Sequence, residues 1–288
     1  MPFRDIHKLP LRSAGVMLVA VLLAAFSAFA QDVAPARSGV VLKIDGPVTP
    51  ANAQYIAREI EEASASGKEL VLIEIDTPGG LVDSMKTIIK AMLASETPVV
   101  TFVAPQGARS ASAGLYIMYA ANVSAMAPGT NTGAATPVEV GGPPSDESPF
   151  EEDAPTEEKE PAPATADESA PAVNPQTDET QSETPPLANN DALRAKVIND
   201  SVAYIRSLAE LRGRNADWAE KAVREAASVT SGEALELGVI DLIADDRADL
   251  LAKLDGRVVK TPKGEKTLQT KNLKLEEIAP TFIERILG

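Results

Sequence analysis

The stretch at residues 69–105, ELVLIEIDTPGGLVDSMKTIIKAMLASETPVVTFVAP, decides the fold. It opens with one apolar run, ELVLIEIDT, and closes with another, TPVVTFVAP. Between them, Met85, Ile88, Ile89 and Met92 recur at helical spacing and share one side of a predicted helix. Two buried strands joined by an amphipathic helix form a βαβ unit, in which the strands are parallel.

The flanking segments continue this alternation. Residues 39–48 read as an apolar strand, and the following helix has Thr49 as a cap, Pro50 in its first turn, and Ile56 and Ile60 at a spacing of four. Farther on, SAGLYIMYAAN reads as a short apolar helix and VSAMAPGT as a strand. We therefore expect an α/β fold of βαβ units, with a parallel sheet covered by helices and a site at the carboxyl ends of the strands.

Residues 139–190 interrupt the pattern with an acidic, proline-rich insert. They hold fourteen acidic residues against the single Lys159, or −13 of the formal charge of −15, and ten of the 22 prolines. Such a segment buries too little apolar surface to order itself, so we expect disorder. It is either a tolerated surface insertion or an electrostatic gate. Because the remainder is nearly balanced in charge, no basic face for nucleic acid is expected.

The expected folded domain comprises residues 31–138 and resumes at residues 191–272. DALRAKVINDSVAYIRSLAELRG predicts a long amphipathic helix that buries Val197, Val202, Ile205 and Leu208. NADWAEKAVREA predicts another helix, and SGEALELGVIDLIAD a short helix followed by a strand. Residues 273–288 close the chain as an amphipathic segment with an apolar stripe of Ile278, Phe282, Ile283, Ile286 and Leu287.

The first thirty residues have the pattern of a secretory signal peptide. A basic start with Arg4, Lys8 and Arg12 precedes a short apolar stretch, and small residues follow at Ala28 and Ala30. We expect cleavage after Ala30 and export to the periplasm or the outer face of the inner membrane. The alternative is an uncleaved membrane anchor, although the apolar stretch is shorter than the ~20 residues of a membrane span.

Composition excludes several kinds of site. The chain has no cysteine and one histidine, His7, which lies within the predicted signal peptide. The exported domain would therefore contain no disulfide, no zinc site of His and Cys, and no Ser–His–Asp triad. We expect neither a metal nor a cofactor. A catalytic serine in this domain would need a base other than histidine.

Two loops at predicted strand ends carry the candidate chemistry. In IDTPGGL, Gly79 and Gly80 open a helix and leave backbone amides free to face a ligand, although a tight turn would look the same. In GARSASAGLYI, Ser112 precedes Ala113 at a predicted helix start. There the Ala113 amide and the helix dipole favour developing negative charge. Close backbone packing is the plainer explanation of such small residues.

Together these motifs resemble a known family. IDTPGG followed by PVVTFVAPQGARSASAGLYIMYAANVSAMAPGTNTGAATPV resembles the NfeD membrane-linked serine proteases of the ClpP class. More distantly it is similar to signal peptide peptidase A and to ClpP. SVTSGEALELGVID matches the closing unit of the ClpP/crotonase fold. The resemblance covers residues 39–138 and 196–245 and implies a ClpP/crotonase-like fold.

The resemblance also implies roles for individual residues. The nucleophile falls on Ser112 rather than Ser110, and the oxyanion hole on the amides of Gly80 and Ala113, with Gly79 shaping the turn. KVINDSVAYIRSLA places Lys196 at the position of the family's general base.

A lysine base imposes physical requirements. It must be neutral, yet the reference pKa of a lysine side chain is about 10.4. Burial in apolar surroundings without a carboxylate partner favours the neutral amine. Lys196 is flanked by Ala195 and Val197, but Asp200 follows at a spacing of four and would keep the amine charged if the two paired.

What the resemblance implies is a serine endopeptidase with a Ser–Lys dyad. It would cleave apolar stretches of membrane-associated proteins, with a stomatin-like (SPFH) protein as substrate or partner, and would form a homodimer or higher oligomer near a membrane. Two alternatives remain: a catalytically silent partner-binding protein of the same fold, and a crotonase-type thioester enzyme that uses the diglycine amides.

Overall fold

The computed structural model describes residues 37–138, 186–281 and 284. The predicted signal peptide, residues 1–30, and nearly all of the acidic insert at residues 139–190 lie outside the described residues.

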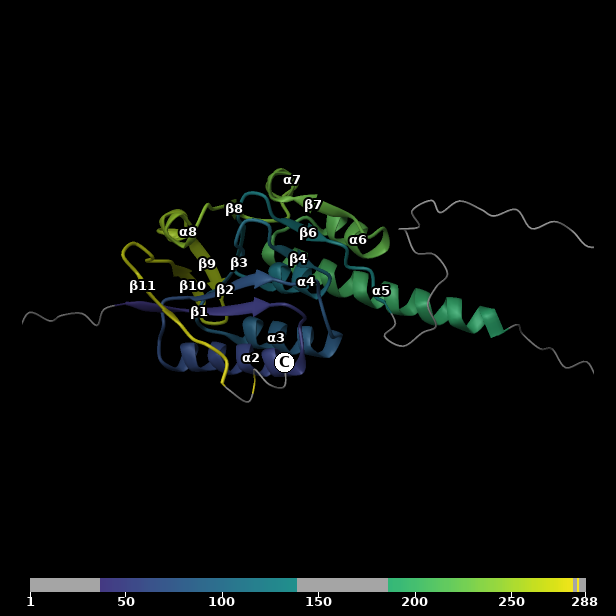
Figure 1. Cartoon of the computed structure of the whole chain (residues 1–288), viewed down its shortest axis with the longest axis horizontal. Helices are drawn as coiled ribbons and strands as arrows, with labels where there is room; N and C mark the ends of the chain where they lie inside the picture. Colours follow the sequence, from purple (N-terminus) through teal and green to yellow (C-terminus); the bar gives the residue numbers. More distant parts are fainter. Residues whose placement is uncertain (1–36, 139–185, 282–283, 285–288) are drawn as a thin grey trace, which may run out of the picture.

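A six-stranded parallel sheet forms the centre of the molecule (Figure 1). Its order is β11-β1-β2-β3-β5-β8, and every neighbouring pair is parallel. The strands are β1 (Ser38–Asp45), β2 (Val71–Asp76), β3 (Val99–Val103), β5 (Val123–Met126), β8 (Leu242–Ile243) and β11 (Lys274–Glu277). The α/β fold with a parallel sheet expected from the sequence is confirmed.

Both faces of the sheet are covered. Along β2, Ile73 and Ile75 belong to the core that also holds helix residues, whereas Leu72 belongs to a second core on the opposite face. Side chains alternate across a strand, so a continuous apolar run fills two cores at once. The first core lies against α2 (Pro50–Ala65), α3 (Val82–Ala94), α4 (Ala113–Ala120), α5 (Pro186–Arg212) and α6 (Ala216–Arg224). The second includes α8 (Arg247–Leu254) and residues near the hairpin of β9 (Val258–Thr261) and β10 (Gly264–Thr267).

The start of α2 follows the sequence signals closely. The Thr49 side chain accepts a hydrogen bond from the Asn52 amide, and the Asn52 side chain accepts one from the Thr49 amide. Pro50 occupies the first turn, where no intrahelical amide is needed. The expected Thr49 cap is confirmed.

A second, small sheet holds the loop that precedes α4. It consists of β4 (Arg109–Ala111), β6 (Asn131–Gly133) and β7 (Ser228–Thr230), in that order, and α7 (Ser231–Glu236) follows it. The backbone of Thr77, just past β2, bonds both ends of β4: its amide donates to Arg109 (2.8 Å), and its carbonyl accepts from Ala111 (3.1 Å). The diglycine loop and the approach to Ser112 are therefore fixed to each other by backbone bonds.

Two boundaries differ from the sequence expectations. α5 begins at Pro186, inside the segment expected to be disordered, and its first half extends away from the body (Figure 1). Val197, expected to face inward, is 40% exposed, because the described residues place no other helix or strand over the first half of α5 to bury it. Val202, Ile205 and Leu208 are buried as expected.

The chain end also differs. Residues 274–277, expected within a terminal amphipathic segment, form β11 and extend the main sheet beside β1. The Tyr55 hydroxyl of α2 then donates a hydrogen bond to the Ile278 carbonyl, which holds the chain against α2 beyond the strand. Within the described residues, no helix combines the length and apolar character needed to cross a membrane.

Candidate active site

Ser112 stands at the turn between β4 and α4 in an unusual backbone conformation. Its φ is 51° and its ψ −114°, a region that non-glycine residues rarely occupy. Its amide donates to the Gly133 carbonyl (3.0 Å), and its carbonyl accepts from the Leu115 amide (3.0 Å), so both backbone groups are held. Strain of this kind costs about 1–3 kcal/mol and concentrates at functional sites.

The diglycine loop packs directly against this turn. A β-carbon on Gly79, whose φ is +116°, would lie 2.6 Å from the Ser112 β-carbon. A β-carbon on Gly80 would lie 2.3 Å from the Val48 carbonyl oxygen. Backbone bonds from Val48 to Gly79 (2.7 Å) and from Leu81 to Val48 (2.9 Å) hold the loop in place. Only residues without a side chain fit in this space.

Two backbone amides near Ser112 are free to bind an anion. Within residues 37–138 and 186–281, neither the Gly80 amide nor the Ala113 amide donates a hydrogen bond to a protein acceptor. Ala113 is the first residue of α4, where the helix dipole adds positive potential. The structure thus places both amides expected for an oxyanion hole beside one pocket, while Gly79 lies behind them in the turn.

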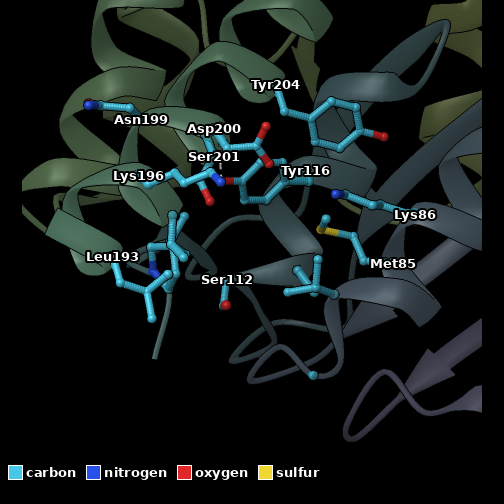
Figure 2. Close-up of a pocket in the computed structure, with 16 residues that line it drawn as sticks. Met85, Lys86, Ser112, Tyr116, Leu193, Lys196, Asn199, Asp200, Ser201 and Tyr204 are labelled. Atoms are coloured by element: carbon cyan, nitrogen blue, oxygen red, sulfur yellow. Dashed lines mark hydrogen bonds between the residues drawn. The ribbon is translucent and has the colours of Figure 1, made fainter. Parts of the chain in front are cut away.

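The pocket itself has a volume of about 630 Å³ and contains both Ser112 and Lys196 on its walls. Ser112 belongs to the start of α4 and Lys196 to α5, and Figure 2 shows both among the side chains that line the pocket. The α5 residues Lys196, Asp200 and Tyr204 follow one another at a spacing of four and so share one face of the helix. The acidic insert separates Ser112 from Lys196 in sequence, but the fold places both in the same pocket.

Lys196 does not show the burial expected of a lysine base. It is exposed, and within the described chain no hydrogen bond joins it to Ser112. Nor does an ion pair join it to Asp200, although both residues line the pocket. Lys196 is therefore not paired with Asp200 among the described residues, but these residues also do not bury it as a lysine base would require.

Ser110 lies elsewhere. It is fully buried in β4 and does not line the pocket. Its hydroxyl has no hydrogen-bond partner among the described residues, and a β-carbon on Gly114 would lie 2.5 Å from the Ser110 Oγ. Close packing therefore accounts for Ser110, whereas Ser112 reaches the pocket.

Two tyrosines, which the sequence did not single out, connect α4 to α5. The rings of Tyr116 and Tyr204 stack with centroids 5.9 Å apart, and the Tyr116 hydroxyl donates to the Ser201 carbonyl (3.3 Å). Burial raises the pKa of Tyr116 to about 12, and the nearby Asp200 carboxylate acts in the same direction. Tyr116 stays neutral and hydrogen-bonded at neutral pH, so this contact fixes the helix of Ser112 against the helix of Lys196.

The far end of α4 is anchored by two arginines. The buried Arg214 donates to the carbonyls of Tyr119 (2.9 Å) and Ala121 (3.0 Å) and pairs with Asp241 (2.5 Å). Arg212 donates to the Ala120 carbonyl (2.8 Å), and burial together with the charge of Arg214 lowers the pKa of Arg212 to about 10. Guanidinium groups at a helix C-terminus complement its dipole, so α4 is held at both ends.

Comparison with known proteins identifies the family. Residues 40–217 match the family described as "NfeD1b, N-terminal domain". The chain belongs to this family. The NfeD resemblance seen in the sequence is thereby confirmed.

Two curated relatives extend the comparison. Membrane-bound protease PH1510 of Pyrococcus horikoshii is 32% identical over 250 residues, which cover 86% of this chain and 47% of the relative. Membrane protein NfeD1b of Bacillus subtilis is 30% identical over 125 residues, covering 43% of this chain and 27% of the relative. The chain thus spans half or less of the length of the curated relatives it matches.

Solved structures of a similar domain share the fold. A lysine-to-alanine variant of the 1510-N membrane-bound stomatin-specific protease, in complex with a substrate peptide, aligns with a TM-score of 0.65 at 30% identity, covering 88% of this chain and 97% of that one. A serine-to-alanine variant aligns with a TM-score of 0.63 at 31% identity, covering 85% and 99%. The ClpP-like α/β fold expected from the resemblance is confirmed.

Proposed function

We propose that this chain is a serine-type endopeptidase in which Ser112 is the nucleophile and Lys196 the general base. The observation that carries the proposal is the position of Ser112. It sits in a strained turn at the N-terminus of α4, beside two amides that have no protein acceptor among the described residues, in a pocket that Lys196 also lines. A nucleophile, an oxyanion site and a base within one pocket suit acyl transfer.

In the acylation step, the neutral Lys196 amine takes the proton of the Ser112 hydroxyl as Oγ attacks the peptide carbonyl carbon. The carbonyl π electrons move to oxygen, and the amides of Gly80 and Ala113 stabilise that oxyanion. Collapse of the tetrahedral intermediate breaks the C–N bond, and the Lys196 ammonium returns its proton to the leaving amine. An acyl ester on Ser112 remains.

In the second step, water replaces the leaving amine. Lys196 removes a proton from water as its oxygen attacks the ester carbonyl, and the same two amides hold the new oxyanion. Breaking the ester bond releases a carboxylic acid product, and Ser112 Oγ regains a proton from Lys196. No metal or cofactor takes part in the proposed reaction.

The mouth of the pocket favours an apolar substrate. Three apolar side chains that line the pocket remain substantially exposed, Val82 (54%), Leu193 (53%) and Val197 (40%), and so does the adjoining Leu81 (47%). They come from the start of α3, the residue before it, and the first half of α5. A bound apolar peptide would remove their surface from water and dehydrate the neighbouring Lys196.

The similar proteins suggest a substrate and a cellular location for this chain. Because the similar 1510-N domain is called stomatin-specific, we propose a stomatin-like (SPFH) protein as substrate or partner here as well. Its full-length counterpart is called membrane-bound, which supports a site of action at a membrane. Export to the periplasmic side, with a cleaved signal peptide, remains part of this proposal. So does a homodimer or higher oligomer, in which a second chain would help to cover the exposed half of α5.

A serine-reactive fluorophosphonate tests the proposal directly. We expect the purified protein to be modified at Ser112, as located by mass spectrometry of the digested product, and to cleave apolar peptides with loss of activity on labelling. The same protein with Ser112→Ala should remain unlabelled. A folded protein that binds an apolar peptide but neither reacts with the probe nor cleaves the peptide would instead be a partner-binding member of this fold.

A further inference from the structure

A second lysine lies in the same pocket. Lys86, on α3, lines the cavity that contains Ser112 and Lys196. Figure 2 shows its amine pointing inward toward the two tyrosine rings, on the side of the pocket opposite Lys196. The proposed mechanism gives this amine no role.

The surroundings of Lys86 leave its charge only partly compensated. The residue is half-buried, and its amine lies 5.7 Å from the centroid of the Tyr204 ring, at cation–π distance. No ion pair forms between Lys86 and a carboxylate of the described residues, Asp200 included. An ammonium that points toward aromatic rings and has no ion pair among the described residues is well placed to pair with a carboxylate that enters the pocket.

The next lysine on the same helix provides a contrast. Lys90 follows Lys86 by one turn, is exposed, and does not line the pocket. Two lysines of equal charge on α3 thus differ in their access to the site.

We propose that Lys86 is a specificity residue that selects a carboxylate on the substrate, at the end of the pocket away from Lys196. The proposal rests on the peptidase function above and adds a charge preference to its apolar substrate class. The favoured substrate is an apolar peptide that carries one carboxylate, either an acidic side chain or a free C-terminus, placed to reach α3.

The two ends of the pocket would then recognise different parts of the substrate peptide. The exposed apolar residues at the mouth would hold the apolar portion of the peptide, and the ammonium of Lys86 would fix its register. A peptide that placed a positive charge beside Lys86 would bind less well because of charge repulsion. A peptide with its carboxylate at another position would leave Lys86 unpaired or bring that carboxylate close to Asp200. Positive charge at Lys86 therefore supplies discrimination that an apolar surface alone lacks.

A peptide scan with charge-altered variants tests this role. One apolar parent peptide is made with Glu, Gln or Lys at each position in turn, and each version with a free or an amidated C-terminus. We expect the wild-type protein to cleave one Glu peptide about fivefold or more faster, in kcat/KM, than its Gln counterpart. A preference confined to the free-acid peptides would identify the C-terminal carboxylate as the recognised group.

The variants separate recognition from folding, because each reports a ratio between two peptides. Lys86→Met should bring the Glu-to-Gln ratio close to one, and Lys86→Glu should reverse it in favour of the Lys peptide. Lys90→Met, the matched control, should keep the wild-type ratio. The proposal is overturned if no carboxylate is preferred by the wild type, if Lys86→Met keeps the preference, or if Lys90→Met loses it equally.

A binding measurement keeps this test independent of catalysis. Fluorescence anisotropy with labelled peptides and the Ser112→Ala protein should show the same carboxylate preference and the same loss on adding Lys86→Met. A preference in binding without hydrolysis by the wild type would refute the peptidase function and retain the role of Lys86. Hydrolysis by the wild type without a carboxylate preference in either assay would support the peptidase function and refute the role of Lys86.

Discussion

Gly79 and Ser112 are in such close contact that a single methyl group would not fit between them. A β-carbon on Gly79 would lie 2.6 Å from the Ser112 β-carbon and 3.1 Å from its Oγ. Real β-carbons do not approach that closely, so a substitution must displace either the diglycine loop or the serine. Position 79 must therefore be glycine because of its contact with Ser112, the proposed nucleophile.

Gly79→Ala should therefore abolish peptide cleavage while leaving most of the fold intact. The positive φ of +116° adds backbone strain to the collision, and a shift of about 1 Å at a reacting group can cost 100-fold in rate. Gly232→Ala is the control, because a β-carbon there meets nothing within 4 Å. Peptide hydrolysis and thermal unfolding of both variants would check this. A fully active Gly79→Ala protein would contradict the arrangement.

Ser112→Ala and Ser110→Ala should have opposite consequences. The first removes the proposed nucleophile and should eliminate cleavage and fluorophosphonate labelling, with the fold retained. The second removes a buried hydroxyl that has no partner among the described residues. Losing an unsatisfied polar group costs little or is stabilising, so we expect activity and an unchanged or raised melting temperature. An inactive but folded Ser110→Ala protein would show that the assignment of the nucleophile to Ser112 is wrong.

Lys196→Ala and Lys196→Arg should both be inactive, because a guanidinium does not deprotonate in proteins and cannot serve as the base. In the wild type, the rate should rise with pH, since only the neutral amine accepts the serine proton. Lys90→Arg, on an exposed lysine outside the pocket, should leave the pH profile unchanged. Measuring kcat/KM from pH 6 to 10 would check this, and a working Lys196→Arg enzyme would rule out the dyad.

Arg214→Ala should lower the free energy of unfolding by about 3–5 kcal/mol, the range for breaking a buried charged network. It would leave the carbonyls of Tyr119 and Ala121 without their donor and Asp241 without its partner. Arg224→Ala, which removes an exposed ion pair with Glu220, should cost at most about 1 kcal/mol. Urea denaturation of both variants gives the comparison. Equal costs would mean that Arg214 does not anchor α4 as described.

Glu284 supplies a pH-dependent contact at the chain end. Its pairing with Arg58 lowers the pKa of Glu284 from 4.5 to about 2. A lowered carboxyl pKa stabilises the fold above the unfolded-state value, and this contribution is lost as the pH falls from about 4.5 toward 2. Glu284→Gln should thus be less stable than wild type at pH 7 by up to about 1 kcal/mol, and the difference should vanish near pH 2. Urea unfolding across this range measures it, with the exposed Glu61→Gln as control.

The sequence predicted strands β1, β2, β3, β5 and β8 of the main sheet and helices α2 to α7, because each depends on local signals, but it predicted neither β11 nor α8. Strand β2 is an unbroken apolar run, and α2 has both its cap and its proline. The small sheet was not predicted, because β4, β6 and β7 have three residues each and pair with segments far away in the chain. No periodicity can be read from three residues. Their pairing is decided by tertiary structure.

For the site, small residues and a family resemblance pointed to Ser112 and the diglycine loop, and the structure places these residues together. The local sequence could not show that Lys86 lines the pocket, because Lys86 looks like any other lysine on an amphipathic helix. Its position is defined only when α5 packs opposite α3. For Val197 the sequence prediction was wrong. The helical periodicity predicted burial, but the first half of α5 leaves this side chain 40% exposed.

The position of β11 has a consequence for how the protein is made. Because β11 pairs with β1, the backbone of residues 38–41 completes its hydrogen bonds only when residues 274–277 have been synthesised. Until then the nascent chain carries an open strand edge that other chains could pair with. A shortened protein that stops before Lys274 would contain every residue proposed for catalysis and still keep this edge unpaired. Its characteristic failure would be self-association during synthesis rather than defective chemistry.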